Sequence, residues 1–459
     1  MKKSLYTLAA VAAMTLASGC ESMDITPKYQ GNSESWYSND LELEMAVSEF
    51  YKLAYWVQPL ESSEQWTDNF TYRQQNRNPG SNGTVLDGTL NGQQWEVYIL
   101  WENAYKLIAR CNSLLNNCHR AEGNVLPEKL ERYKAEAYFA RACKYAELMC
   151  YYGDVPYMTG EETISEAEQR GRTPMSEIKP LVYEDFDRAI AALPLDYGKE
   201  AVHFTKGAAM AMKARYALYF GDFEIAAKAA KDCMDLGIYS LEPDFTNIFL
   251  QRTKQIPEKI FSIPRSYELG VKVDEWFVKN GLPRCVGGYG SDNPSWDLLA
   301  AFLCTDGLPI DESPLFDPRN PFKNRDPRFY HDIVFDGFKY VNGEASIVDK
   351  SAQLYTGGRW RHILDASSTG YLYQKLVPHT SNKVDDAAGY GLNPNADVPY
   401  MRLADIYLMY AEAVGASKGA TGKSDNYSRT AADAINVIRD RCGAGHVAAK
   451  FTASRERFL

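Results

Sequence analysis

The segment YFGDFEIAAKAA, residues 219–230, joins two stretches of helical periodicity through a Gly-Asp pair. Alanine recurs on both sides of Gly221, and alanine side chains are small enough to let two helices approach closely. Glycine at the joint permits the tight turn that reverses the chain. The segment therefore predicts an antiparallel helix hairpin, and it constrains the fold more than any other feature of the sequence.

The same kind of pattern recurs along the chain. Apolar residues at helical spacing predict helices over the ranges 40–57, 93–118, 127–152, 174–193, 205–220, 223–237, 401–417 and 426–443. Pro127 at the start of the third helix, and Gly153 followed by Pro156 at its end, mark its bounds. Helix hairpins of this kind resemble tetratricopeptide units, which stack on one another into superhelices.

Residues 241–399 differ from this pattern, because they are rich in Pro, Gly, Asn and Asp. They predict loops with brief strands and one short helix within 293–307, and the polar residues 61–93 predict a long loop. We therefore expect a mostly α fold, in which tetratricopeptide-like helix pairs form a right-handed superhelix beside a large irregular, loop-rich insert that carries short strands. The helical scaffold would comprise 20–240 and 400–459, and the insert 241–399, within a single domain.

The first twenty residues have the layout of a secretory signal that ends in a cysteine. Lys2 and Lys3 precede a compact apolar run, and small residues lead to Cys20. This arrangement resembles the lipobox of bacterial lipoproteins, in which the thiol is acylated and the cysteine becomes the new N-terminus. We therefore expect residues 1–19 to be a signal peptide and Cys20 to carry a lipid anchor. A chance cysteine in an ordinary signal peptide is the alternative.

Composition argues against several classes of partner. The chain has 459 residues, a net charge of −10 and no basic block, so we expect no nucleic-acid ligand. After the signal, no apolar run approaches the ~20 residues of a transmembrane helix. Aromatic residues are numerous, with 31 Tyr and 8 Trp. Such side chains can fill a core, but proteins that bind flat apolar ligand faces use them as well.

The sequence carries no motif of a known catalytic or metal site. Neither H-E-x-x-H nor G-x-S-x-G occurs, and the opposed carboxylates that a glycoside hydrolase needs cannot be recognised from spacing alone. No C-x-x-C occurs either, and Cys111 with Cys118, and Cys143 with Cys150, are better explained as small buried hydrophobes within helices. We therefore expect a protein that is not an enzyme and that needs no metal and no cofactor.

Several segments, in their order and spacing, resemble the SusD/RagB family of outer-membrane lipoproteins. The segments that carry the resemblance are AYKLIARCNSLL, KAEAYFARACKYAELMCYYGDVP, HFTKGAAMAMKARYALYFGDFEIAAKAA, NPSWDLLAAFLCTDGLPI, DPRNPFKNRDPRF, STGYLYQK, PYMRLADIYLMYAEAVG and AADAINVIRDRCG. With the lipobox they cover nearly all of residues 20–450. The resemblance implies an all-α fold of four tetratricopeptide-like pairs, with an irregular region that carries most of the ligand site.

The resemblance also implies a function at the outer membrane. Members of the family bind oligosaccharide or polysaccharide at the cell surface and deliver it, uncleaved, to a SusC-like TonB-dependent barrel. The expected partners are therefore a glycan, that transporter, and the membrane through Cys20. A tetratricopeptide-type scaffold lipoprotein that binds protein or peptide ligands is the alternative. The final KFTASRERFL resembles the start of a helix that continues in the family, so we expect the chain to be incomplete beyond Leu459.

Sugar binding needs aromatic faces against the ring and polar side chains for the hydroxyls, and three segments supply this mixture. The candidate residues are Trp66, Asn69, Tyr72, Arg73 and Asn76, with Asp68, in the first; Trp276, Tyr289 and Trp296, with Asn293, in the second; and Trp360, with Arg359, in the third. The alternatives are a first loop folded onto its own aromatic rings, a Trp296 that packs its helix, and a plain turn at Trp360. Trp95 and Trp101 lie on a periodic helix and are expected in the core.

Replacing Cys20 by Ser is expected to release the protein from membranes without changing its fold, because serine offers no thiol for acylation. Each buried CH₂ of a lipid chain contributes about 0.8 kcal/mol, so the anchor would dominate the attachment. Fractionation of cells that express either form measures the release. A Cys20→Ser protein that still sediments with membranes would show that the lipobox interpretation is wrong.

Overall fold

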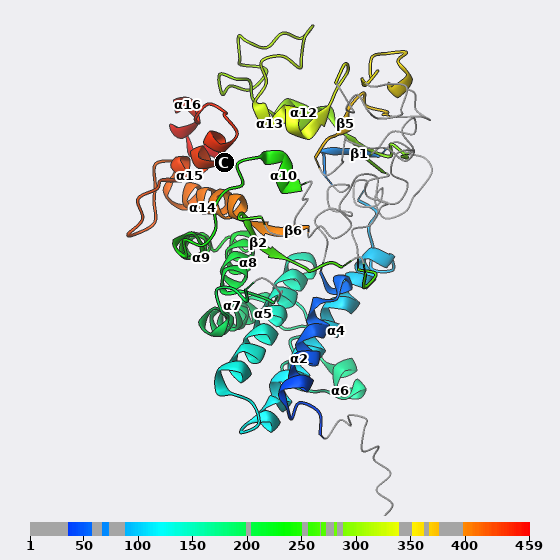
Figure 1. The fold of residues 1–459 in the computed structure, drawn as a ribbon, viewed down its shortest axis with the longest axis vertical. Helices are drawn as coiled ribbons and strands as arrows, with labels where there is room; N and C mark the ends of the chain where they lie inside the picture. Colours follow the sequence, from blue (N-terminus) through cyan, green and yellow to red (C-terminus); the bar gives the residue numbers. More distant parts are fainter. Residues whose placement is uncertain are drawn as a thin grey trace, which may run out of the picture.

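The longer helices fill the lower part of Figure 1 and continue up its left side, and short strands, loops and small helices fill the rest of the upper part. This computed structural model describes residues 35–56, 67–72, 88–198, 203–249, 256–266, 268–271, 280–281, 288–338, 351–361, 367–375 and 398–459. The expected signal peptide and Cys20 lie outside the described residues. None of the described helices combines the length and apolar character needed to cross a bilayer.

Most of the helices that form the scaffold follow the predicted ranges, whereas the short helix α6 was not predicted. They are α2 (Asp40–Ser48), α4 (Trp95–Asn117), α5 (Pro127–Tyr152), α6 (Ile164–Gln169), α7 (Met175–Ala192), α8 (Lys206–Tyr219), α9 (Phe223–Asp235), α14 (Leu403–Lys418) and α15 (Ala431–Arg441). Three 3₁₀ turns accompany them: η1 (Glu49–Tyr51), η2 (Leu53–Tyr55) and η4 (Cys118–Ala121). The helix expected over 40–57 is therefore α-helical only in its first half.

The remaining elements are short. Between the scaffold helices lie α10 (Phe245–Phe249), α12 (Trp296–Ala301), α13 (Pro327–Asp332) and η6 (Arg359–Arg361), and after them come α16 (Ala449–Thr452) and α17 (Arg455–Phe458). The strands that the structure describes form antiparallel pairs, each of two strands. The pairs are β1 (Phe70–Tyr72) with β3 (Asp292–Pro294), β2 (Lys259–Ser262) with β6 (Pro399–Arg402), and β4 (Ile333–Val334) with β5 (Leu372–Tyr373).

Local sequence explains where the main helices begin and end. Pro127 occupies the first turn of α5, where its missing N–H leaves no bond unmade, and Gly153 ends the helix with a φ of +67°. The Thr205 hydroxyl caps α8 by accepting the N–H of Ala208 at 3.2 Å. Gly221, with a φ of +75°, makes the turn from α8 into α9. The hairpin predicted at residues 219–230 is confirmed.

Apart from α6, each scaffold helix packs against the next one along the chain, so that α5 packs against α7, and α9 packs against α14 across the intervening residues. Both α8 and α9 pack closely and carry many buried alanines, as the sequence predicts, among them Ala208, Ala211, Ala214, Ala226 and Ala230. The right-handed tetratricopeptide-like superhelix, and the division of the chain at 241 and 399, stay predictions.

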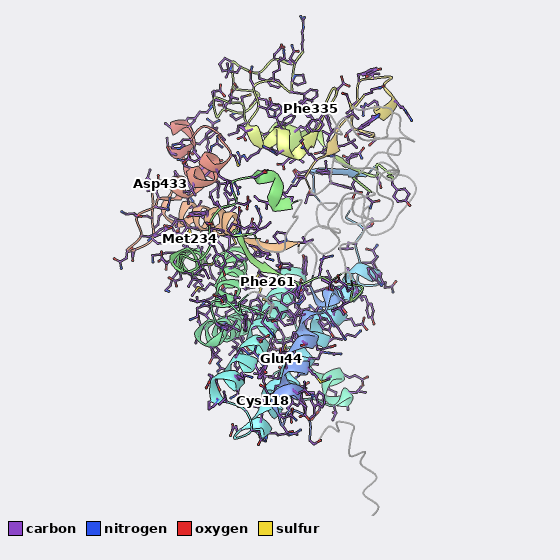
Figure 2. All side chains as sticks on the ribbon, in the orientation of Figure 1. Glu44, Cys118, Met234, Phe261, Phe335 and Asp433 are labelled. Atoms are coloured by element: carbon purple, nitrogen blue, oxygen red, sulfur yellow. The ribbon has the colours of Figure 1, made fainter. Side chains whose placement is uncertain are left out.

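A cluster of aromatic rings joins the scaffold to the β2–β6 ribbon. Trp56 lies 5.3 Å from Phe261 of β2 and 5.5 Å from Phe204, measured between ring centroids. Phe139 of α5 lies 4.6 Å from Phe204 and 5.6 Å from Phe261, and Tyr400 of β6 lies 5.2 Å from Phe261. Phe261 marks the centre of this junction in Figure 2. Burial of these rings therefore fixes the ribbon on the helices.

The upper part of the molecule has a small core of its own. Leu299 of α12, Phe329 of α13 and Ile333 of β4 are fully buried there, and Phe335, labelled in Figure 2, packs against them. The buried Arg325 guanidinium lies 4.9 Å from the ring centre of Phe329 and donates to main-chain carbonyls around it. This core holds the elements from which the candidate site is built.

Two sequence expectations about side-chain burial are wrong. Trp95 is 66% exposed, whereas Trp101 packs against the core as predicted, with Tyr152 at 5.1 Å. The Tyr152 hydroxyl donates to the Val97 carbonyl at 2.6 Å, so α5 ends level with Val97 and offers nothing to cover Trp95. Cys150, in the last turn of α5, is exposed, whereas the cysteines at 111, 118 and 143 are buried.

A buried ion pair connects three scaffold helices. Arg141 of α5 donates to both carboxylate oxygens of Asp185 of α7, at 2.8 and 2.9 Å. A third donor of the same guanidinium binds the side-chain oxygen of Asn112 of α4 at 2.9 Å. Both charged side chains are almost completely buried. The geometry is bidentate, so the desolvation of each charge is offset only while its partner is present.

Arg141→Ala is expected to destabilise the fold by about 3–5 kcal/mol, because the Asp185 carboxylate would remain buried without its partner. Lys228→Ala is the matched control, since Lys228 forms an exposed ion pair with Asp232 one turn along α9. We expect that control to change stability by less than about 1 kcal/mol. Urea unfolding followed by circular dichroism measures both effects, and equal losses would contradict the argument.

Candidate functional site

The β1–β3 ribbon brings together two of the three segments that the sequence singles out. Thr71 pairs with Asn293 in its register, although more than 200 residues separate the two strands along the chain. Just outside the ribbon, the main-chain N–H of Ser295 donates to the carbonyl of Asn69 at 3.0 Å, and its hydroxyl donates to the carbonyl of Asp68. The loop around Asn69 therefore lies beside the start of α12.

The stretch that follows the third segment joins them from β5, and the main-chain N–H of Ser367 ties this stretch to the Trp360 carbonyl at 3.0 Å. The Tyr373 hydroxyl donates to the Asn69 carbonyl at 3.0 Å. The side-chain oxygen of Asn293, which is fully buried, accepts the main-chain N–H of Ser368 at 2.7 Å. In Figure 1, β1, β5 and α12 accordingly lie near one another at the upper right. Two of the predicted segments and the stretch that follows the third thus meet at one place, which we call the convergence site (residues 67–72, 288–296, 359–361 and 367–373).

Two aromatic rings at the convergence site face solvent. Trp296 is 43% exposed and begins α12, whose first turn is capped by the Ser295 hydroxyl. Its ring lies 6.2 Å from the ring of Tyr371, at an angle of 35°. Tyr371 packs on its other side against the small upper core, and burial raises the pKa of its hydroxyl. Tyr289 is also exposed. A half-exposed indole backed by a fixed phenol can stack on a flat apolar face of a ligand.

Trp360 has a different environment, which corrects its assignment as a candidate. Its side chain is fully buried in η6, so its ring is part of the packing and is not available to a ligand. The neighbouring Arg361 guanidinium donates to the carbonyls of Ser367 and Ser368 and lies against Gly370, where an added Cβ would be 3.2 Å away. Arg359 is exposed. The third segment therefore supports the site by packing and hydrogen bonds, and its Trp360 ring does not face the ligand.

The structure leaves several candidates without a described position. Trp66, Arg73, Asn76 and Trp276 lie outside the described residues, and Tyr72 belongs to β1 without a described side chain. The main-chain carbonyl of Asn69 is the part of that residue that contacts the site, because it accepts hydrogen bonds from Ser295 and Tyr373.

Tyr371 was not among the residues predicted from the sequence, although the segment STGYLYQK contains it. Only the three-dimensional structure shows that its ring lies beside Trp296. The described residues contain no group of three or more potential metal ligands.

Two family models match the chain on either side of its middle. The model described as "SusD family" matches residues 257–458, and the model described as "Starch-binding associating with outer membrane" matches residues 29–218. Together they cover the convergence site and the scaffold helices other than α9 and the last residue of α8.

Curated relatives are similar at low identity. SusD-like protein P2 of Formosa agariphila is 25% identical over 57% of this chain and 53% of its own length, so the chain spans about half of that relative. A SusD-like protein of Bacteroides ovatus is 21% identical over 90% of this chain and 72% of its own length.

Solved structures share the fold. A SusD-like protein of Bacteroides fragilis superposes with a TM-score of 0.76 at 24% identity, over 93% of this chain and 82% of that one. A laminarin-binding SusD-like protein gives a TM-score of 0.61 at 20% identity, over 92% and 88% of the two chains. The mostly helical fold, the two family models and these relatives agree, and the chain belongs to the SusD/RagB family.

Proposed function

We propose that this protein captures oligosaccharide or polysaccharide at the convergence site and passes it on without cleaving it. The observation that carries the proposal is the exposed Trp296 ring, backed by Tyr371, at the point where three distant segments meet. A pyranose offers a C–H face that stacks on such a ring, and its hydroxyls bind polar side chains nearby. The names of one family model, which mentions starch, and of a structural neighbour, which mentions laminarin, support a glycan as the ligand.

The proposed contacts extend beyond the described residues. Tyr72 ends β1, and Trp66, Arg73 and Asn76 flank that strand in sequence, so these residues are proposed as further ligand contacts, together with Tyr289 and Trp276 from the segment that leads into β3. The mixture of aromatic, amide and guanidinium groups suits a neutral or weakly charged sugar. Asn69 would help to hold this loop through its carbonyl.

Anchoring and delivery complete the proposal. A lipid on Cys20 would hold the protein on the outer membrane, and a SusC-like TonB-dependent barrel would receive the glycan. No catalytic role is proposed for any residue of the site, since binding alone requires only stacking and hydrogen bonding. A scaffold that binds protein would instead retain its partner regardless of the state of Trp296, and the next experiment separates the two.

Trp296→Ala is expected to weaken glycan binding about tenfold, which corresponds to the loss of about 1.4 kcal/mol of stacking energy. Affinity electrophoresis and calorimetry with starch and laminarin, followed by a glycan array, provide the measurement. Tyr219→Ala is the matched control, because Tyr219 is an exposed aromatic side chain at the end of scaffold helix α8. Absence of binding to every glycan class, or equal loss in both variants, would rule out the proposed site.

Trp360→Ala is expected to act through stability and not through direct contact. Removing a fully buried indole leaves a cavity and costs about 3–5 kcal/mol, whereas truncation of the half-exposed Trp296 costs less than about 1 kcal/mol. Thermal unfolding of the two variants measures the difference. A Trp360→Ala protein as stable as Trp296→Ala would mean that the ring is not part of the packing.

A further inference from the structure

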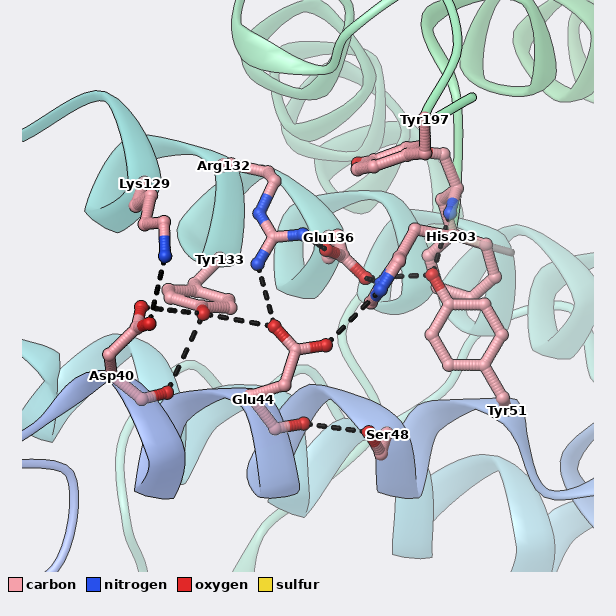
Figure 3. Close-up of polar contacts among 11 residues, drawn as sticks. Asp40, Glu44, Ser48, Tyr51, Lys129, Arg132, Tyr133, Glu136, Tyr197 and His203 are labelled. Carbon is pink, nitrogen blue, oxygen red and sulfur yellow. Dashed lines mark hydrogen bonds and ion pairs between the residues drawn. The ribbon is translucent and has the colours of Figure 1, made fainter. Parts of the chain in front are cut away.

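A histidine joins three segments of the scaffold that are distant in sequence. Figure 3 shows His203, in the segment before α8, between a carboxylate of α2 and a carboxylate of α5. Its Nδ1 lies 3.2 Å from Oε2 of Glu136, and its Nε2 lies 3.1 Å from Oε1 of Glu44. A neutral imidazole has only one N–H, so it can donate to one of these carboxylates, whereas the imidazolium donates to both.

The surrounding groups hold both carboxylates in place. The Tyr51 hydroxyl of η1 donates to the same Oε2 of Glu136 at 2.7 Å and accepts the main-chain N–H of Phe204 at 2.6 Å. The Tyr133 hydroxyl donates to Glu44 at 2.9 Å. Tyr197 covers the imidazole, with ring centroids 4.9 Å apart. Glu136 is fully buried, so its negative charge depends on nearby cations.

Two cations face these two carboxylates. Arg132 of α5 donates to Oε2 of Glu44 at 2.8 Å and lies 3.9 Å from Oε1 of Glu136, and protonated His203 supplies the second positive charge. At the start of α2, Asp40 forms a separate ion pair with Lys129 of α5 at 2.8 Å. With Glu44 and Glu136 both ionised, these charges balance when the imidazole carries its proton.

The electrostatic surroundings agree with this geometry. Burial by itself lowers the pKa of His203, but the hydrogen bond and charge of Glu136, together with the charge of Glu44, outweigh it, so that pKa is raised. A raised histidine pKa adds stability that is fully present below the ordinary value of about 6.5 and is lost as the pH rises through the raised value. Burial raises the pKa of Glu44, but hydrogen bonds from Arg132 and Tyr133 outweigh burial and hold it low, so Glu44 stays charged throughout this range.

We propose that His203 is a protonation-dependent clasp that holds α2 and η1 on the scaffold, closed at mildly acidic pH and loosened above neutrality. Without the proton, one of the two carboxylates loses the hydrogen bond from His203, and the imidazole no longer connects Glu44 of α2 with Glu136 of α5 through two donors. The consequence is local, because α2 packs on α4 and α5 near the edge of the scaffold, whereas the convergence site lies in the upper part of the molecule.

Hydrogen–deuterium exchange of the full chain at about pH 6 and about pH 8.5 tests the clasp. After correction for intrinsic exchange, peptides covering α2 should lose protection at the higher pH relative to peptides covering α14. For each unit by which the pKa of His203 is raised, the protection of α2 against exchange should fall about tenfold between the two pH values. His203→Gln should abolish the pH dependence, because glutamine stays neutral at both pH values.

His446→Gln is the matched control, since His446 also contacts a carboxylate, that of Asp440 at 2.7 Å, but both side chains are exposed. This variant should keep the pH dependence of α2. If His203→Gln does not fold, exchange at the imidazole Cε1–H of the wild-type protein gives the pKa of His203 directly. A pKa at or below the ordinary value, α2 protection that is equal at both pH values, or a pH dependence that His203→Gln retains would overturn the proposal.

Discussion

Burial of aromatic rings between the helices and the β2–β6 ribbon is the contact on which the rest of the architecture depends. Trp56, Phe139 and Phe204 come from the scaffold, and Phe261 and Tyr400 come from the ribbon. The ribbon stands at the two ends of the insert, just after its first helix and just before α14. A single apolar cluster therefore fixes both points at which the insert leaves and rejoins the helices, and the segments between them are free to build a site.

Some residues of the convergence site are buried and support it, and others are exposed to solvent. Asn293 and Trp360 are fully buried, and Asn293 uses its side chain to bind the neighbouring segment at Ser368. Trp296 stays half exposed because it occupies the first position of α12, while Tyr371 supports its ring from the small upper core. A rigid frame of this kind presents aromatic faces with little motion to lose on binding, which favours affinity.

The positions of the main helices could be predicted from the sequence. The exposure of side chains at helix ends and the contacts between distant loops could not. Periodicity and capping signals gave α5 and the α8–α9 hairpin, since those signals are local. Trp95 was misassigned because periodicity identifies a face but not where the covering helix stops, and α5 stops at Tyr152. The pairing of β1 with β3 had no local signal, because each strand is three residues long and its partner is remote.

The same remote pairing has a consequence for biogenesis. Ser295 and Asp68, which share a hydrogen bond beside β1, are 227 positions apart, and Tyr373 and Asn69 are 304 apart. A ribosome adds about 5–20 residues per second, so the first segment waits on the order of ten seconds or more before its partners have been translated. The early helices can fold meanwhile, but the convergence site can form only after the chain has been translated beyond Tyr373.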